Sequence, residues 1–66
     1  MAWKPPKRVQ IKICLSSGKD IIGELYEWDS GGEWVSVLDG LYPVTIYFDN
    51  IEKIEDLTNR KTLFSK

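Results

Sequence analysis

Arg8-Val9-Gln10-Ile11-Lys12-Ile13-Cys14-Leu15 is the stretch of this 66-residue sequence that decides the fold. Aliphatic side chains occupy its odd positions, and the even positions between them are polar or hold the single cysteine. Alternation with a period of two is typical of a β-strand that buries one face. We therefore expect the aliphatic side chains from Val9 to Leu15 to point into the core of a sheet.

Glycine-containing turn signals divide the rest of the chain into further short strands. The predicted turns are 16–19, 30–32 and 39–40. The strands that they separate are predicted at 20–29, 33–38 and 44–48. We expect Val35 and Val37 to face inward. Ile51 and Ile54 stand three residues apart, which fits a single helical turn leading into a fifth strand at 52–57.

Strands this short predict a strongly bent sheet rather than a flat one. A flat sheet of four or five strands would leave its edges unpaired and one apolar face in water. Gly23, inside the second strand, indicates a bulge, a sharp bend or a close backbone approach. We therefore predict an all-β fold, a small five-stranded, strongly bent antiparallel barrel over residues 8–57. Pro5-Pro6 makes residues 1–7 an extended basic arm, and residues 58–66 are expected to be a polar C-terminal tail.

A twelve-residue segment resembles the first sequence motif of the Sm proteins. It reads Gly18-Lys19-Asp20-Ile21-Ile22-Gly23-Glu24-Leu25-Tyr26-Glu27-Trp28-Asp29, in which Gly, an aliphatic residue, Gly, Leu and Asp recur at the offsets of that motif. The resemblance implies an Sm-like or Src-homology-3-like barrel, assembly into a ring and binding of single-stranded RNA. The second Sm motif is not matched, because Tyr47 and Phe48 stand where the family has an Arg-Gly pair.

A shorter segment, Val44-Thr45-Ile46-Tyr47, is similar to a strand of the plasmid-borne type II dihydrofolate reductases, which are also small barrels. In those enzymes this strand lines the central pore of a tetramer. The resemblance implies a remote alternative, an oligomeric enzyme of that kind.

Charge is distributed unevenly along the chain. Residues 1–19 contain five Lys and Arg and no acid, residues 20–56 contain all ten acids and one lysine, and residues 57–66 contain three basic residues. The body is therefore acidic and both ends are basic. The ends either pair with the body or a second subunit, or they contact phosphate. In the second case the candidate nucleic-acid contacts are Lys4, Lys7, Arg8 and Lys12, with Trp34 and Tyr47 able to stack on bases.

Aromatic residues exceed what so small a core needs. Tyr26 and Trp28 are predicted on the face of the second strand opposite Ile21 and Leu25, outside the primary core. Aromatic side chains are enriched in protein interfaces. Tyr26, Trp28 and Trp34 are therefore the candidate subunit or partner interface, with base stacking as the alternative role.

Several kinds of chemistry are excluded by composition. The chain has no histidine and one cysteine, Cys14. An internal disulfide, a cysteine zinc site and a Ser-His or Cys-His pair therefore cannot form. We expect no enzyme activity, no metal and no cofactor, and Cys14 as a partly buried, inert thiol. A lone thiol without an apolar export or membrane-spanning segment favours the cytoplasm.

Two functions remain open at this stage. The first is a non-catalytic binding module, an Sm-like ring protein that binds single-stranded RNA. The alternative is a protein-interaction or assembly barrel with no nucleic-acid ligand, which the acidic body favours. A homo-oligomer is expected in both cases, because a core this small commonly needs additional stabilisation.

Overall fold

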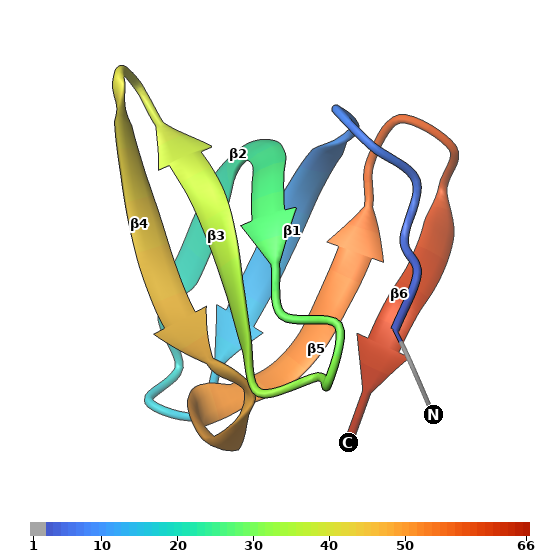
Figure 1. Cartoon of the computed structure of the whole chain (residues 1–66). Coiled ribbons are helices and arrows are strands. Elements are labelled where there is room, and N and C mark those ends of the chain that lie inside the picture. The colour runs from blue at the N-terminus through green and yellow to red at the C-terminus, as the bar shows by residue number, and fades with distance from the viewer. Residues whose placement is uncertain (1–2) are drawn as a thin grey trace.

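Strand β1 (Gln10–Leu15) lies near the middle of a six-stranded antiparallel sheet in the computed structural model, which describes residues 3–66. The other strands are β2 (Asp20–Trp28), β3 (Trp34–Asp39), β4 (Tyr42–Tyr47), β5 (Ile51–Asp56) and β6 (Lys61–Ser65). A single 3₁₀ turn, η1 (Phe48–Asn50), joins β4 to β5. The strand order is β4-β3-β2-β1-β5-β6 (Figure 1). The all-β prediction is confirmed.

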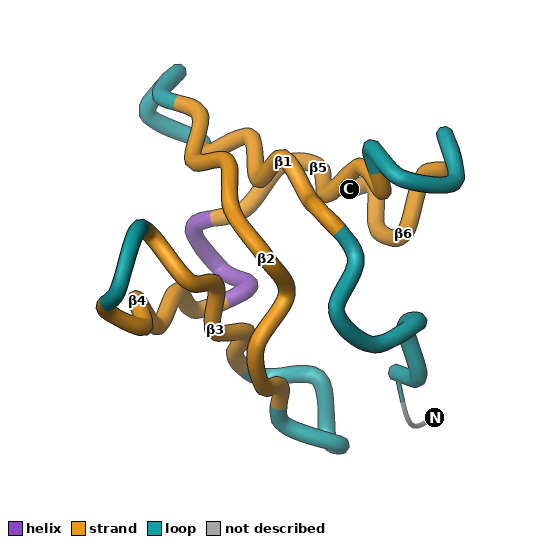
Figure 2. The backbone as a smooth tube through the Cα atoms, turned by 90° about the horizontal axis from the view of Figure 1, so that it is seen from above, coloured by secondary structure: helices purple, strands orange, loops and turns teal. Residues whose placement is uncertain are grey.

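The predicted inward face of β1 is confirmed. Val9, Ile11 and Ile13 are buried, and Leu15 is half-buried beside a bulge in the β1–β5 pairing. The sheet curls so that its two halves lie opposite each other (Figure 2). The core is completed from both halves by Leu25, Val35, Val37, Ile46, Ile51 and Ile54.

Gly23 lies where the backbone of β3 passes directly beside β2. A Cβ atom at this position would collide with the carbonyl oxygen of Leu38 and lie 2.9 Å from the Cγ2 atom of Val37. Only glycine leaves room for this backbone approach. The sequence prediction of a close approach or bend at Gly23 agrees with this geometry.

Six strands stand where five were predicted, because the expected tail contains β6. Leu63 and Phe64 are half-buried and pack against the core, so this segment gains apolar contacts by pairing with β5. Within residues 3–66, β4 and β6 are the two outer strands of the sheet and do not pair with each other, so the sheet is not closed.

The single helical turn lies three residues earlier than predicted. It covers Phe48–Asn50, whereas Ile51 and Ile54 are both buried in β5. Cys14 pairs with Lys53 but Leu15 pairs with Ile51, which makes Glu52 an extra residue in β5. This bulge, rather than a helical turn, brings two isoleucines three residues apart to the same side.

A second bulge corrects the predicted face of Trp28. Leu25 pairs with Val37 and Glu27 pairs with Ser36, so Tyr26 is the extra residue of β2. Trp28 then pairs with Val35, which is buried, and therefore faces the core side. Tyr26 and Trp28 do not share an outer face, as the simple alternation had predicted.

Four aromatic rings form a chain that joins the arm to the sheet. Trp3 meets Trp28 and Phe48 edge to face, with ring centroids 6.3 and 5.2 Å apart, and Phe48 meets Phe64 at 4.9 Å. The indole N–H of Trp3 donates a hydrogen bond to the carbonyl oxygen of Leu63 at 3.1 Å. The arm therefore packs across β6, while Met1 and Ala2 of the predicted arm lie outside the described residues.

The turn between β5 and β6 is organised by the buried carboxylate of Asp56. Its Oδ1 atom accepts hydrogen bonds from the N–H groups of Thr58 and Asn59, both at 2.9 Å, and Oδ2 accepts one from the side-chain amide of Asn59 at 2.8 Å. Burial alone would raise the pKa of Asp56, but these donors outweigh it and hold the pKa below its usual value.

Acid should weaken this hairpin. A carboxyl group with a depressed pKa in the folded state stabilises the fold above its unfolded pKa, near 4, and loses that contribution as pH falls through the folded value. We expect Asp56→Asn to lower the melting temperature at pH 7 and to flatten its decline below pH 4. Thermal melts across pH measure both effects. Asp39→Asn, at the exposed end of β3, is the control, and equal effects of the two variants would contradict the assigned role of Asp56.

Candidate functional site

Two hollows lie on either side of the end of β2. The first, which we name the arm hollow, has a volume of about 320 Å³ and is lined by Lys7, Arg8, Leu25, Tyr26, Glu27 and Trp28. The second, which we name the aromatic groove, has a volume of about 330 Å³ and is lined by Tyr26, Glu27, Trp34, Ser36, Pro43, Thr45 and Tyr47. Tyr26 and Glu27 belong to both, so the two hollows adjoin.

The arm hollow exists because β2 extends beyond its partner β1. The β1–β2 pairing ends at Gln10 and Glu24, followed by one hydrogen bond from the Leu25 N–H to the Val9 carbonyl oxygen at 2.9 Å. Arg8 then adopts a φ of 58°, a left-handed conformation that turns the chain away from the sheet.

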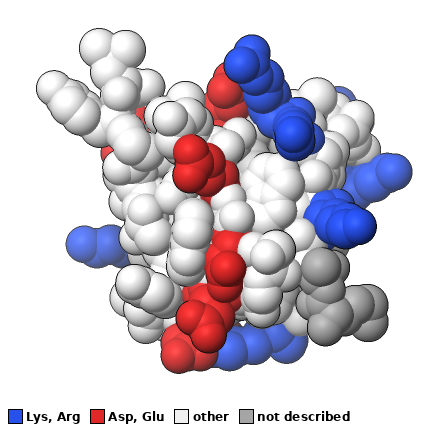
Figure 3. Space-filling model, in the orientation of Figure 1, with Lys and Arg blue, Asp and Glu red and all other residues white. Residues whose placement is uncertain are grey.

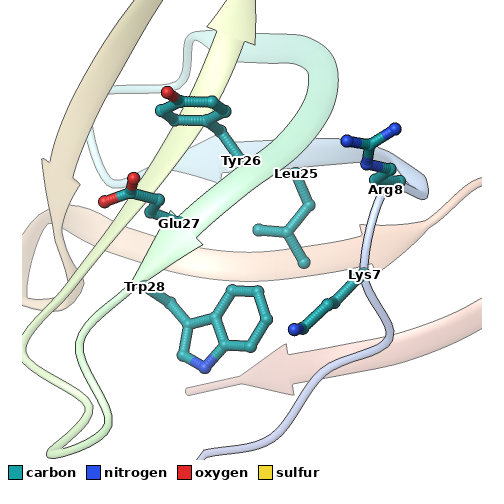
Figure 4. Close-up of a pocket in the computed structure, with 6 residues that line it drawn as sticks. All are labelled: Lys7, Arg8, Leu25, Tyr26, Glu27 and Trp28. Carbon is teal, nitrogen blue, oxygen red and sulfur yellow. The ribbon is translucent and has the colours of Figure 1, made fainter.

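The residues of the arm hollow point in two directions from β2. Figure 4 shows Leu25 and Trp28 pointing toward the arm that carries Lys7 and Arg8, whereas Tyr26 and Glu27 point to the other side of the strand. Lys7 and Arg8 are exposed, and Leu25 is buried. The arm hollow therefore combines two exposed cationic side chains with an apolar floor and one indole ring.

The aromatic groove lies on the outer face of β2, β3 and β4. Val35 and Val37 fill the core, so the alternating residues of β3, Trp34 and Ser36, face outward. Trp34 is directly opposite Tyr47 in the β3–β4 pairing. Two aromatic side chains therefore stand next to each other at one end of the groove.

A satisfied polar pair forms the middle of the groove. Ser36 is opposite Thr45, and their hydroxyl oxygens are 2.8 Å apart, within hydrogen-bond distance. Ser36 is buried, so this bond removes the cost of leaving its hydroxyl group unpaired. The groove thus offers a ligand aromatic walls and a hydrogen-bonded floor.

Acidic side chains border the aromatic groove. Glu27 lines it, and Glu33 and Asp49 line a third hollow that adjoins it at Tyr47. Figure 3 shows Asp and Glu side chains in a strip along the middle of the face turned to the viewer, with several Lys and Arg side chains gathered toward one side. A ligand in the aromatic groove therefore meets negative charge. A ligand in the arm hollow meets the positive charges of Lys7 and Arg8 in addition to the negative charge of Glu27.

The structure brings only part of the predicted nucleic-acid contacts together. Lys7 and Arg8 share the arm hollow, and Lys4 is exposed on the same arm. Lys12 lies on β1, and its Nζ atom is 3.6 Å from the Oδ2 atom of Asp20. Trp34 and Tyr47 lie in the aromatic groove instead.

The predicted interface residues also do not lie together on one surface. Tyr26 is 48% exposed at the boundary of the two hollows, and Trp34 lies in the groove, but Trp28 packs on the core side. Sequence reasoning missed Pro43, Thr45 and Ser36. The inward assignment of Val35 and Val37 was the available signal, since it places Ser36 on the outer face.

Cys14 has the properties of an unreactive thiol. It is half-buried on β1, where burial first, and then a hydrogen bond to Asp20, raises its pKa. A raised pKa keeps the sulfur protonated at neutral pH, and the thiol is a poor nucleophile and ligand. Among residues 3–66 there is no group of three or more Cys, Asp or Glu side chains arranged to hold a metal ion.

The chain matches no protein-family model, no curated protein and no solved structure. In the part of the chain that the structure describes, no helix has the length and apolar character needed to cross a membrane. The functional assignment therefore depends on the two hollows and on the charges around them.

Proposed function

We propose that this chain is a non-catalytic binding module whose ligand is an extended protein segment held in the aromatic groove. The observation that carries the proposal is the gathering of Tyr26, Trp34 and Tyr47 around one hollow on the outer face of three neighbouring strands. Grooves lined by aromatic side chains bind extended, proline-containing segments, which lose little conformational entropy on binding.

The charge around the groove specifies the ligand further. Glu27 inside the groove and Glu33 and Asp49 beside it would attract a Lys or Arg of the bound segment and repel phosphate. The expected ligand is therefore a segment that combines proline or another apolar residue with a basic residue. This chemistry favours a protein partner over RNA at this groove.

The arm hollow supports single-stranded RNA as a second candidate ligand. Lys7 and Arg8 face the side of β2 that carries Trp28, and cationic side chains beside an aromatic ring suit a phosphate backbone with a stacked base. In this case the arm, rather than the groove, would provide the affinity. The binding would weaken as salt is raised, because phosphate contacts release counterions.

We also propose that the curled sheet belongs to a known class of small β-barrels. An Sm-like or Src-homology-3-like barrel is supported by the order β4-β3-β2-β1-β5, by the bend at Gly23 and by the short 3₁₀ turn before β5. In that assignment β6 is an addition at one edge. A cytoplasmic location is likewise proposed, since the single cysteine makes no internal disulfide.

One titration separates the two ligands. Peptides with Pro and Lys residues, and a uridine-rich RNA, are each added to the labelled protein and followed by NMR chemical shifts at low and high salt. We expect the peptides to shift Trp34 and Tyr47, and Trp34→Ala to weaken that binding by about tenfold or more, as for a central aromatic contact. Ile22→Ala, an exposed apolar change outside both hollows, is the control.

Binding of RNA rather than peptide would indicate that the arm hollow is the binding site. Salt-dependent RNA binding that is lost in a Lys7→Ala and Arg8→Ala double variant, but kept in Trp34→Ala, would replace the peptide proposal with the RNA one. If neither ligand binds, both proposals are wrong.

A further inference from the structure

The two outer strands of the sheet differ in how well they are protected. The edge strand β6 begins with Lys61, and its Leu63 carbonyl oxygen accepts a hydrogen bond from the indole N–H of Trp3. The other edge strand, β4, reads Tyr-Pro-Val-Thr-Ile-Tyr and has no charged residue. In Figure 1, β4 stands free at one side of the sheet, whereas the arm runs beside β6. Exposed uncharged edges are sites of strand pairing with another chain.

Large apolar and aromatic side chains are exposed at β4 and in the turn before it. Leu41 is 90% exposed, Tyr42 77% and Tyr47 58%. Because β4 is neutral along its whole length, two copies of this edge can approach each other without repulsion between like charges. A second copy of the chain is therefore a suitable partner for this edge.

Hydrogen-bond directions identify the free groups of β4. The Phe48 N–H donates to the Glu33 carbonyl oxygen at 3.0 Å, on the β3 side. Directions alternate along a strand, so Val44 and Ile46 also bond to β3, while Pro43, Thr45 and Tyr47 direct their backbone groups outward. Proline has no N–H, and within sheets it is tolerated where that position faces away from the neighbouring strand.

We propose that two copies of this chain pair through β4, antiparallel about a twofold axis at Thr45. In this register each Thr45 N–H meets the carbonyl oxygen of the partner's Thr45, and each Tyr47 N–H meets that of the partner's Pro43. If each strand is shifted by one residue, the twofold axis falls at Val44. The backbone groups of Val44 are already bonded to β3 and cannot bond to a second copy. The outward groups therefore favour Thr45 as the centre.

The pairing also completes the aromatic groove, and this part of the inference rests on the proposed function. Pro43, Thr45 and Tyr47 all line the groove on the outer face of β4. Residues directly opposite each other in a sheet share a face, so the partner's Tyr47 comes beside Pro43. The two grooves then form one continuous surface across the axis, long enough for a segment to contact aromatic side chains of both subunits.

Cysteine cross-linking tests the register directly. In a Cys14→Ser background, Thr45→Cys should form a disulfide-linked dimer, because paired residues have Cα atoms ~5.5 Å apart, within the range of a disulfide. Tyr47→Cys lies on the same strand and face, but its two copies would be on the order of 14 Å apart. Thr62→Cys, on the opposite edge, is the second control. We expect cross-linking at position 45 to be at least about tenfold faster than at 47 or 62.

Light scattering on the unmodified chain provides the second measurement. We expect a dimer, and we expect Thr45→Lys to give a monomer because it places two positive charges at the axis. The variant also removes the hydroxyl partner of Ser36, so we expect this monomer to be folded but less stable. Thr62→Lys should leave the mass unchanged. A monomeric wild type at all concentrations, or equal cross-linking at the three positions, would overturn the inference. A monomer that binds peptide refutes only the dimer, and a dimer that binds no peptide refutes only the proposed function.

Discussion

Replacing Gly23 with alanine is expected to remove a large part of the protein's free energy of unfolding. The added Cβ atom would collide with the backbone carbonyl oxygen of Leu38 and would crowd the Cγ2 atom of Val37 at 2.9 Å. Neither neighbour is the flexible end of a long side chain, so β2 and β3 would have to separate at the bend. Overpacking in a core costs about 1–3 kcal/mol and sometimes more, and a domain of this size has only about 3–5 kcal/mol to lose.

Urea denaturation followed by circular dichroism measures this loss. Gly31→Ala, in the turn between β2 and β3, is the matched control, because its Cβ atom would meet only the Asp29 carboxylate, at 3.2 Å. Moving that side chain would disturb only the exposed hydrogen bond that its Oδ2 atom accepts from the Glu33 N–H, so we expect a change in unfolding free energy of less than about 1 kcal/mol. If Gly23→Ala is as stable as Gly31→Ala, the close approach of β2 and β3 is wrong.

The alternation of apolar and polar residues predicted which side chains face the core wherever a strand contains no bulge. Val9, Ile11 and Ile13 lie in the core as the period of two predicts, and so do Val35 and Val37. These segments contain no extra residue, so the face of one side chain determines the faces of the others.

The prediction failed wherever a strand contains an extra residue. Tyr26 in β2 and Glu52 in β5 are such residues, and each reverses the alternation that follows it. A bulge depends on contacts with the neighbouring strand, and neither residue has a composition that marks one. The same limit applies to β6, where a slip in pairing lets two consecutive residues, Leu63 and Phe64, both become half-buried.

The candidate site was only partly predictable for the same reason. Its aromatic residues are visible in the sequence, but their grouping depends on the bulge at Tyr26 and on the left-handed turn at Arg8. Without the bulge, Trp28 would face outward with Tyr26. The separation of the arm hollow from the aromatic groove is therefore a property of the tertiary structure.

Substituting Trp28 and Tyr26 separately should distinguish a structural residue from a binding residue. Trp28 contacts Trp3 edge to face at 6.3 Å, with ring planes at 86°, in the cluster that joins the arm to the core. We expect Trp28→Ala to lower the free energy of unfolding by about 2–4 kcal/mol, somewhat less than for a fully buried tryptophan. Tyr26 is 48% exposed, and Tyr26→Ala should change stability by less than about 0.5 kcal/mol.

Peptide binding should depend on Tyr26, whereas stability depends on Trp28. Tyr26 lines the aromatic groove and Trp28 does not, so Tyr26→Ala should weaken peptide binding by about tenfold while the protein remains folded. Trp28→Phe, which keeps an aromatic ring in the cluster, should bind peptide as the wild type does. Guanidinium denaturation and the peptide titration measure the two properties on the same samples. Equal losses of stability in Trp28→Ala and Tyr26→Ala would mean that both side chains share one face, and the bulge at Tyr26 would then be wrong.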